Sequence, residues 1–194
     1  MRKGIVFLTL LAFAVLVQLP SPSVSAPGAE EGNVDPVHSS VLFRIRYFNA
    51  SAFWGRFNKA SGTMSLSEGG AGSVSITIAT DSLDTAVAAR DKHLKSPDFF
   101  NVKQFPEITF TSKKVHKTGA DTYEAAGTFA MHGVSKDMTL TFKRIGRGKG
   151  RKGESRTGFE STFTLKRSDF GMNFMQGPLS DEVQVTVSLA IVLK

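Results

Sequence analysis

Apolar and polar residues alternate along most of the chain from residue 41 onward, which is the pattern of β-strands with one buried face. In the first such segment, Val41, Phe43 and Ile45 share one face. In the last, apolar residues recur at every second position from Val183 to Ile191. The alternation predicts eight strands, over residues 41–47, 53–64, 74–78, 108–110, 123–131, 138–142, 159–165 and 183–191.

Several connections between these segments are short, which favours antiparallel hairpins between neighbours. His132 and Gly133 predict a tight turn of this kind between the fifth and sixth segments. An antiparallel sheet of eight strands removes its exposed edges by closing, and its interior then has room for side chains or one small ligand. The predicted fold class is therefore all-β, an eight-stranded antiparallel barrel, although alternation alone also allows a sandwich.

Residues 89–110 interrupt the strands between the third and fourth segments. Val87, Asp91 and Leu94 fall on one helical face, so a short helix of roughly three turns is expected, and Pro97 ends it. Two side chains are candidates for its N-cap: Asp84 and Thr85. The barrel is thus predicted to carry a short helical insertion between its third and fourth strands.

Aromatic residues follow this predicted helix closely, at Phe99, Phe100 and Phe105. The chain has 16 phenylalanines, of which only Phe7 and Phe13 lie near the N-terminus. A barrel packed with its own side chains has no evident need for an aromatic insertion. The insertion therefore favours a lid over a ligand tunnel, with a fully packed interior as the alternative.

The N-terminal residues 1–26 are typical of a secretory signal peptide. Arg2 and Lys3 precede an apolar run that is too short to span a bilayer, and small residues end at Ala26. Residues 27–33 are predicted to be a linker, and residues 34–194 the barrel domain. The protein is expected to be secreted, most simply to the periplasm, and with no cysteine it forms no disulfide.

The chain carries a formal net charge of +7, or +5 without Arg2 and Lys3, which favours anionic surfaces. The basic residues of one segment are Lys143, Arg144, Arg147, Lys149, Arg151 and Lys152. Residues 143–153 are predicted to form a flexible, solvated hairpin loop, and contact of residues 143–152 with an anionic membrane surface is the sharper alternative. The predicted export and the lack of aromatics between these charges argue against nucleic acid as a partner.

Catalytic and metal-binding signatures are not found in the sequence. The four histidines occur singly, without the spacing of a preorganised metal site. Asp91, His93 and Asp169 are the candidates for an acid or a base, but no nucleophile and base stand at a recognisable spacing. We therefore expect no enzymatic activity, no metal and no cofactor.

An ordered set of motifs resembles the YceI-like family over residues 33–194. In chain order the motifs are Asp35, His38-Ser39 and Phe43; Gly55-Arg56-Phe57; Arg90-Asp91, His93-Leu94, Ser96, Phe99-Phe100, Pro106, Ile108 and Phe110; Gly127; Gly133-Val134-Ser135-Lys136; Arg167-Ser168-Asp169-Phe170-Gly171-Met172; and Asp181-Glu182-Val183. One departure is that Tyr47 stands where the family usually has a histidine, so no role of that histidine carries over.

The resemblance implies a lipocalin-like barrel that binds a polyisoprenoid, such as an isoprenoid quinone or a polyprenyl phosphate. The expected ligand contacts are Phe43, Phe57, Arg90, Asp91, His93, Phe99, Phe100, Phe105, Phe110, Phe170 and Met172. A guanidinium suits phosphate or carbonyl oxygens. Arg90, Asp91 and His93 therefore either meet the head group or only fix the helix.

Three functions stay open on the sequence. The preferred one is a secreted binding protein that encloses a long-chain isoprenoid lipid for storage or transport. The alternatives are an envelope enzyme that acts on lipids, and a structural or stress-related envelope protein with a filled barrel. A homodimer is also left open.

Overall fold

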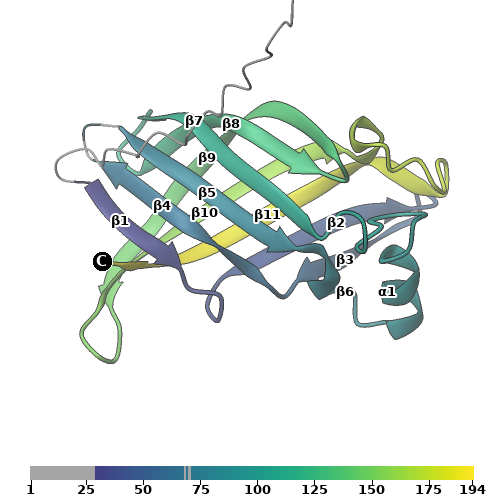
Figure 1. Ribbon diagram of the computed structural model, residues 1–194, viewed down its shortest axis with the longest axis horizontal. Helices are drawn as coiled ribbons and strands as arrows, with labels where there is room; N and C mark the ends of the chain where they lie inside the picture. The colour runs from purple at the N-terminus through teal and green to yellow at the C-terminus, as the bar shows by residue number, and fades with distance from the viewer. Residues whose placement is uncertain (1–28, 68, 70) are drawn as a thin grey trace, which may run out of the picture.

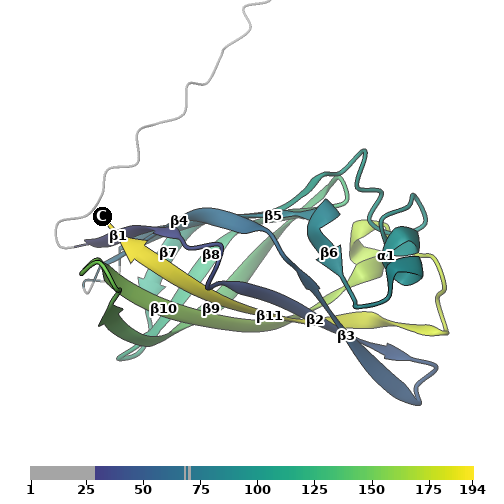
Figure 2. The same ribbon diagram turned by 90° about the horizontal axis from the view of Figure 1, so that it is seen from below.

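The computed structural model describes residues 29–67, 69 and 71–194. The predicted signal peptide, residues 1–26, and residues 27–28 of the predicted linker lie outside the described residues. The described chain forms one closed sheet with an α-helix against one end of it (Figures 1 and 2).

Eight strands close the barrel, and neighbours pair antiparallel. In order around the barrel they are β1 (Ala29–Val34), β4 (Ala60–Ser67), β5 (Gly72–Ala79), β7 (Glu107–Lys117), β8 (Thr122–Met131), β9 (Val134–Lys149), β10 (Ser155–Lys166) and β11 (Leu179–Leu193). β1 pairs with β4 on one side and with the end of β11 on the other, which closes the ring. The predicted eight-stranded antiparallel barrel is confirmed, as is the tight turn between β8 and β9.

The described residues form three further strands, which extend the barrel towards the helix. They are β2 (Ser40–Tyr47), β3 (Ser51–Phe57) and β6 (Leu83–Asp84). β2 takes over from β1 alongside β11, β3 pairs with β2, and β6 pairs with the end of β3. The predicted strand over residues 53–64 is therefore two strands, β3 and β4. They separate because the N–H groups of Asn58 and Lys59 donate to Ser82 rather than to a neighbouring strand.

The prediction that residues 27–33 are a linker is wrong for residues 29–33, which belong to β1. Residues 29–33 form this strand together with Val34, although they lack the apolar alternation of the other strands. Ion pairs hold them instead: Glu30 bonds Arg144 and Arg147, and Glu31 pairs with Lys194. These partners lie more than a hundred residues away, so the local composition gives no sign of the strand.

The prediction that residues 143–153 form a flexible loop is also wrong, because most of this segment is strand. β9 continues to Lys149, and the turn occupies residues 150–154 before β10 begins. This hairpin lies at the end of the barrel away from the helix (Figures 1 and 2). Two of its charged residues, Arg144 and Arg147, therefore take part in the closure of the barrel through their ion pairs with Glu30.

Helix α1 (Ala88–Leu94) lies between β6 and β7, where the insertion was predicted. It has seven residues, about two turns rather than three. Its N-cap residue is Val87, and no side chain caps it, so the predicted caps are wrong. The Asp84 carboxylate instead accepts from the N–H of Ala86. No helix in the described residues is long and apolar enough to cross a bilayer.

Asp35 fixes the junction between β1 and β2. Its carboxylate accepts from the N–H of Val37 at 2.9 Å and from Nη1 of Arg156 at 2.5 Å, and lies 2.8 Å from Nδ1 of His38. The Arg156 guanidinium first, and then His38, hold the pKa of Asp35 well below its usual range. The carboxylate therefore binds protons less readily in the folded state than in the unfolded chain.

The low pKa of Asp35 predicts a loss of stability in acid. Because the unfolded state binds more protons, the free energy of unfolding falls as the pH drops below about 5. Urea unfolding at several pH values between about 5 and 2 measures this slope. Asp35→Asn should be less stable at neutral pH and show a shallower slope, whereas parallel slopes would contradict the prediction.

Close strand packing at Gly127 gives a second prediction. A Cβ there would lie 2.3 Å from the carbonyl oxygen of Thr111 and 2.6 Å from Cα of Ser112, where β7 has a bulge. Gly127→Ala should lower the free energy of unfolding by about 1 to 3 kcal/mol, because backbone must move. Gly146→Ala is the control, since a Cβ there meets nothing within 4 Å. Equal denaturation midpoints for the two variants would refute the packing argument.

Candidate functional site

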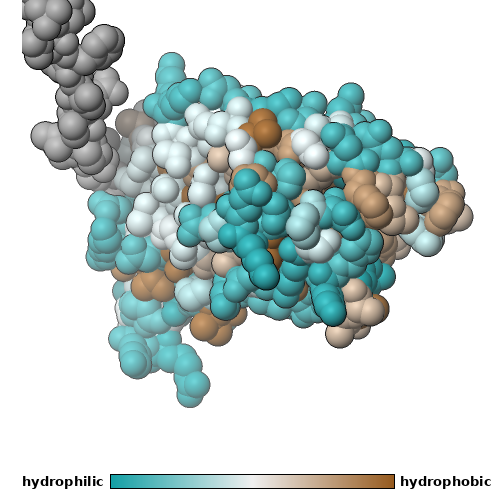
Figure 3. All heavy atoms as spheres, turned by 45° about the vertical axis from the view of Figure 1, so that its right-hand side comes forward, coloured by the Kyte–Doolittle hydropathy of each residue, from teal (hydrophilic) through white to brown (hydrophobic). Residues whose placement is uncertain are grey.

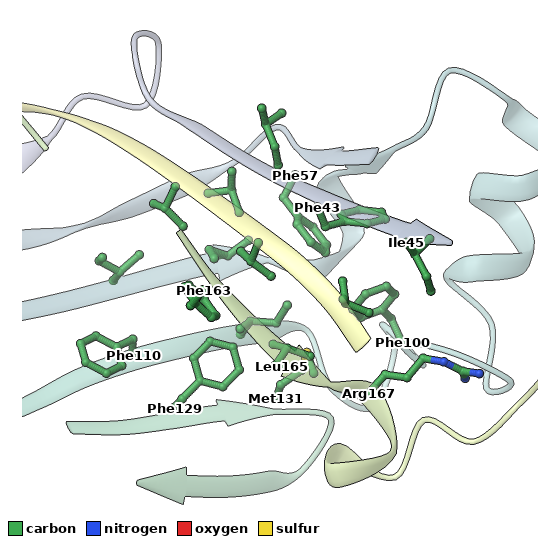
Figure 4. Close-up of a pocket in the computed structure, with 18 of the residues that line it drawn as sticks. Phe43, Ile45, Phe57, Phe100, Phe110, Phe129, Met131, Phe163, Leu165 and Arg167 are labelled. Carbon is green, nitrogen blue, oxygen red and sulfur yellow. The ribbon is translucent and has the colours of Figure 1, made fainter. Parts of the chain in front are cut away.

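An apolar cavity occupies the half of the barrel next to α1. Its volume is about 110 Å³, within about 1060 Å³ of space free of protein atoms that includes the open mouth. The surface that it exposes is entirely apolar. Rings from several strands point into the same space in Figure 4, namely Phe43, Phe57, Phe110, Phe129 and Phe163.

The cavity ends at a floor of packed side chains about halfway along the barrel. On β10, Phe163 and Ser161 line the cavity, but Phe159 does not. On β11, Val187 lines it and Leu189 does not. Phe159 and Leu189 are both 1% exposed. The inward positions of the strands therefore form a hollow half and a filled half.

Arg144 lies on the filled side of this floor. It is buried, and its guanidinium carbon lies 5.2 Å from the ring centre of Tyr123 and 5.4 Å from that of Phe159. Nη2 donates to Glu30 at 3.1 Å, and Asp121 lies within ion-pair distance. Cation–π contacts and ion pairs together compensate the buried charge. They close this end of the barrel to a ligand.

The other end of the cavity opens beside α1 into a second hollow. The two spaces share Phe53, Leu94, Phe99 and Leu179. The second hollow adds more polar side chains, namely Tyr47, Arg90 and His93, together with Met175. Because this hollow joins the apolar cavity to the surface, it is the mouth of the site.

Aromatic residues after α1 form a lid at the mouth. Phe100 meets Phe57 edge to face with ring centres 5.5 Å apart, and both line the cavity. Phe99 meets His93 at 5.1 Å and Phe174 at 5.3 Å. The predicted aromatic lid thus lies over the cavity, with Phe99 facing both the cavity and the mouth.

Arg90 and Asp91 bind the segment before the helix. Arg90 donates from Nε to Oγ1 of Thr85 and from Nη2 to the carbonyl of Thr85, both at 2.7 Å, and it lies 4.5 Å from the ring centre of Phe53. Asp91 Oδ1 accepts from the N–H of Thr85 at 2.8 Å and from its hydroxyl at 2.5 Å. These contacts fix α1 against the barrel.

His93 contributes a ring to the mouth. Its Nε2 lies 2.9 Å from Oδ2 of Asp98, and both side chains are about half exposed. The ring also meets Phe174 at 5.4 Å. His93 is therefore the more exposed polar group at the mouth, and two N–H groups of the less exposed Arg90 donate to Thr85.

The other predicted contacts divide into two groups. Those that line the cavity are Phe43, Phe57, Phe99, Phe100, Phe110 and Met172. Asp91, Phe105 and Phe170 line neither the cavity nor the mouth. Phe105 packs on His132 at 4.6 Å, and Phe170 on Phe129 at 5.5 Å. As ligand contacts, all of these residues stay predictions.

Arg167 is a buried cation at the mouth end of the cavity, and it is not among the contacts expected from the sequence. Its guanidinium donates to the carbonyls of Met172, Phe174, Leu179 and Ser180. Burial lowers the pKa of Arg167, and the nearby carboxylate of Asp181 opposes this. The available signal in the sequence was its position two residues after Leu165, which continues the inward alternation of β10 just beyond the end of that strand. Its role is to hold the segment between β10 and β11.

The enzymatic candidates are not assembled into one site. Asp169 pairs with Lys136 at 3.1 Å on the surface, away from the mouth that His93 lines, and Asp91 bonds Thr85. Within the described ranges, no group of three or more histidine or acidic side chains is placed to hold a metal ion. The arrangement is suited to binding an apolar molecule.

Comparisons with known proteins agree on one family. A family model described as the YceI-like domain matches residues 33–191. A UPF0312 protein of Pectobacterium atrosepticum is 36% identical over 183 residues, which cover 93% of this chain and 95% of that protein.

Two solved structures share the fold. BcnA of Burkholderia cenocepacia superposes with a TM-score of 0.73 at 23% identity, over 81% of this chain and 98% of that one. A domain from Saccharophagus degradans, described as polyisoprenoid binding and implicated in plant cell wall breakdown, superposes with a TM-score of 0.63 at 18% identity. That match covers 86% of this chain and 99% of the domain.

The contacts of Arg90 predict that it stabilises the protein without any ligand. Arg90→Ala should lower the free energy of unfolding of the ligand-free protein by about 1 to 3 kcal/mol, because two charge-assisted hydrogen bonds and the contact with Phe53 are lost. Lys92→Ala, at an exposed position of the same helix, is the control. If Arg90→Ala unfolds like the wild type and instead weakens binding only of ligands with a polar head, Arg90 belongs to the ligand site.

Proposed function

The chain belongs to the YceI-like family, and from this membership we propose that it is a binding protein that encloses an isoprenoid or similar long apolar chain and catalyses no reaction. The observation that carries the proposal is the apolar cavity, closed by a floor at one end and open beside α1 at the other. The fold shared with a domain described as polyisoprenoid binding supports an isoprenoid as the ligand class.

The geometry limits how much of a ligand fits. From Ser161 to Arg167 the cavity follows six residues of a tilted strand, so its depth is about 15 Å. That is about half of the roughly 30 Å hydrocarbon core of a bilayer. The hollow half therefore takes a stretch of chain about as long as one leaflet is thick, and the rest of a longer chain extends through the mouth.

The head group is proposed to stay at the mouth. The cavity surface is apolar, and the donors of Arg167 are taken by backbone carbonyls, so a charged group inside would lose its hydration without gaining a partner. Arg90 and His93 line the mouth. A quinone or a polyprenyl phosphate that binds with its tail first would place its apolar chain in the cavity and its polar head at the mouth.

The remaining parts of the proposal are secretion to the periplasm and a role in storage or transport. They rest on the predicted signal peptide. Contact of residues 143–152 with an anionic membrane is a weaker part, because this hairpin lies at the end away from the mouth (Figure 1). A homodimer also stays a prediction.

The two alternatives have less support. For an enzyme, Asp91, His93 and Asp169 each have a hydrogen-bond or ion-pair partner and do not share one site. For a filled barrel, only the half beyond the floor is packed. Extraction of the purified protein with organic solvent, followed by mass spectrometry, tests the proposal. An extract without a stoichiometric apolar compound, from protein that also takes up no added isoprenoid quinone, would favour the filled barrel.

A variant that fills the cavity gives the matching prediction. Val185 lies on the inward face of β11 and lines the cavity, so Val185→Phe puts a ring into the space of the ligand. Uptake of an isoprenoid quinone should weaken at least about tenfold, or about 1.4 kcal/mol. Gln184→Phe adds the same ring to the exposed outer face of the same strand and should bind like the wild type. Equal affinities of the two variants would place the ligand outside the barrel.

A further inference from the structure

The turn between β2 and β3 carries exposed aromatic side chains beside the mouth. Phe48 is 58% exposed and Tyr47 42%, and their rings meet edge to face at 4.6 Å. The N–H of Phe48 donates to the carbonyl of Pro178, which ties the turn to the segment that carries the exposed Phe174. Figure 3 brings this end of the molecule forward and shows apolar residues among the hydrophilic ones. Exposed rings therefore gather around the mouth.

The flank of the same hairpin is basic. Residues 40–57 contain three arginines and no acidic residue. Arg44 lies opposite Trp54 in the ladder, and residues two apart in a strand share a face, so Arg46 and Arg56 lie on this face as well. Arg56 lies opposite Asp84 on β6, whose carboxylate offsets its charge. Within the described part of the chain, neither Arg44 nor Arg46 forms an ion pair with a carboxylate. The hairpin thus combines an aromatic tip with two arginines, Arg44 and Arg46, that have no carboxylate partner.

We propose that the β2–β3 hairpin docks the mouth of the barrel onto an anionic lipid bilayer. Tryptophan and tyrosine favour the interface between water and membrane, and each basic residue near an anionic surface adds attraction. Phe48 at the tip reaches the acyl boundary, while Trp54, Arg44 and Arg46 lie at the level of the head groups. The mouth then faces the bilayer, and an apolar chain passes into the cavity without crossing water. The transfer of an apolar chain from the bilayer rests on the proposed function, whereas the docking itself can be tested without a ligand.

The opposite end of the barrel offers a competing surface. The β9–β10 hairpin carries the basic residues of segment 143–152 and an exposed Ile145. Arg144 and Arg147, however, pair with Glu30, and the segment has no aromatic residue. Docking through this end would also hold the mouth away from the membrane (Figure 2). The aromatic content and the position of the mouth both favour the β2–β3 hairpin.

The single tryptophan of the chain makes the test direct. Trp54 is 53% exposed and lies on the hairpin, so its emission reports what this face contacts. The ligand-free protein is mixed with vesicles of phosphatidylcholine alone, or of phosphatidylcholine with phosphatidylglycerol. Sedimentation with the anionic vesicles, a blue shift of the emission, and weakening of both by salt are expected.

Variants assign the docking to one end. Arg44→Gln and Arg46→Gln should each weaken vesicle binding about fivefold, and Phe48→Ser should weaken it as well. These side chains are at least partly exposed, and urea unfolding checks that the variants stay folded. Ile145→Ser removes an apolar side chain of similar exposure to Phe48 from the opposite end and should bind like the wild type.

Three results would overturn the proposal. The first is the absence of binding to anionic vesicles. The second is binding that leaves the Trp54 emission unchanged and is weakened by Ile145→Ser but not by Phe48→Ser, which assigns the membrane to the basic hairpin. The third is a dimer that Phe48→Ser dissociates, which assigns the aromatic tip to a second copy of the chain. Uptake of isoprenoid quinone from detergent is measured separately, so a failure of docking and a failure of ligand binding are told apart.

Discussion

The pairing of β1 with both β4 and β11 is the contact on which the barrel depends. It removes the two edges that an eight-stranded sheet would otherwise expose to other chains. It also brings Glu30 to Arg144, so that the strand that closes the ring supplies the carboxylate for the cation below the floor. Closure, the filled half and the blocked end are thus consequences of one short strand.

The division of the interior reconciles a stable barrel with an apolar cavity. Tyr123, Phe159 and Leu189 form a packed core that needs no ligand. The hollow half keeps its shape through contacts made by the backbone and the lid, such as those of Arg167 with the carbonyls between β10 and β11. Apolar burial in one half therefore stabilises the fold while the other half stays free to bind.

The sequence predicted the strands well because their inward faces follow a local rule. Phe43 and Ile45 alternate with Arg44 and Arg46, and both apolar residues line the cavity. The short strand β1 was not predicted because Glu30 and Glu31 have partners far along the chain. The break between β3 and β4 was not predicted for the same reason, since it depends on a contact with Ser82.

The sequence predicted an apolar site lined by phenylalanines, but it did not predict how far the cavity extends into the barrel. Phe105 resembles the other phenylalanines of the insertion in sequence, yet it packs on His132 from the turn between β8 and β9. Whether Ser161 or Phe159 meets the cavity depends on the stagger of all eight strands, which no local pattern carries.

The floor has a consequence for the order of events. A barrel with one opening loads and unloads in single file, so the end of a chain that enters first is the last to leave. If the tail enters first, an acceptor must bind the head group while the tail is still inside the cavity. Transfer would then pass through a complex in which this protein holds the tail and the acceptor holds the head group.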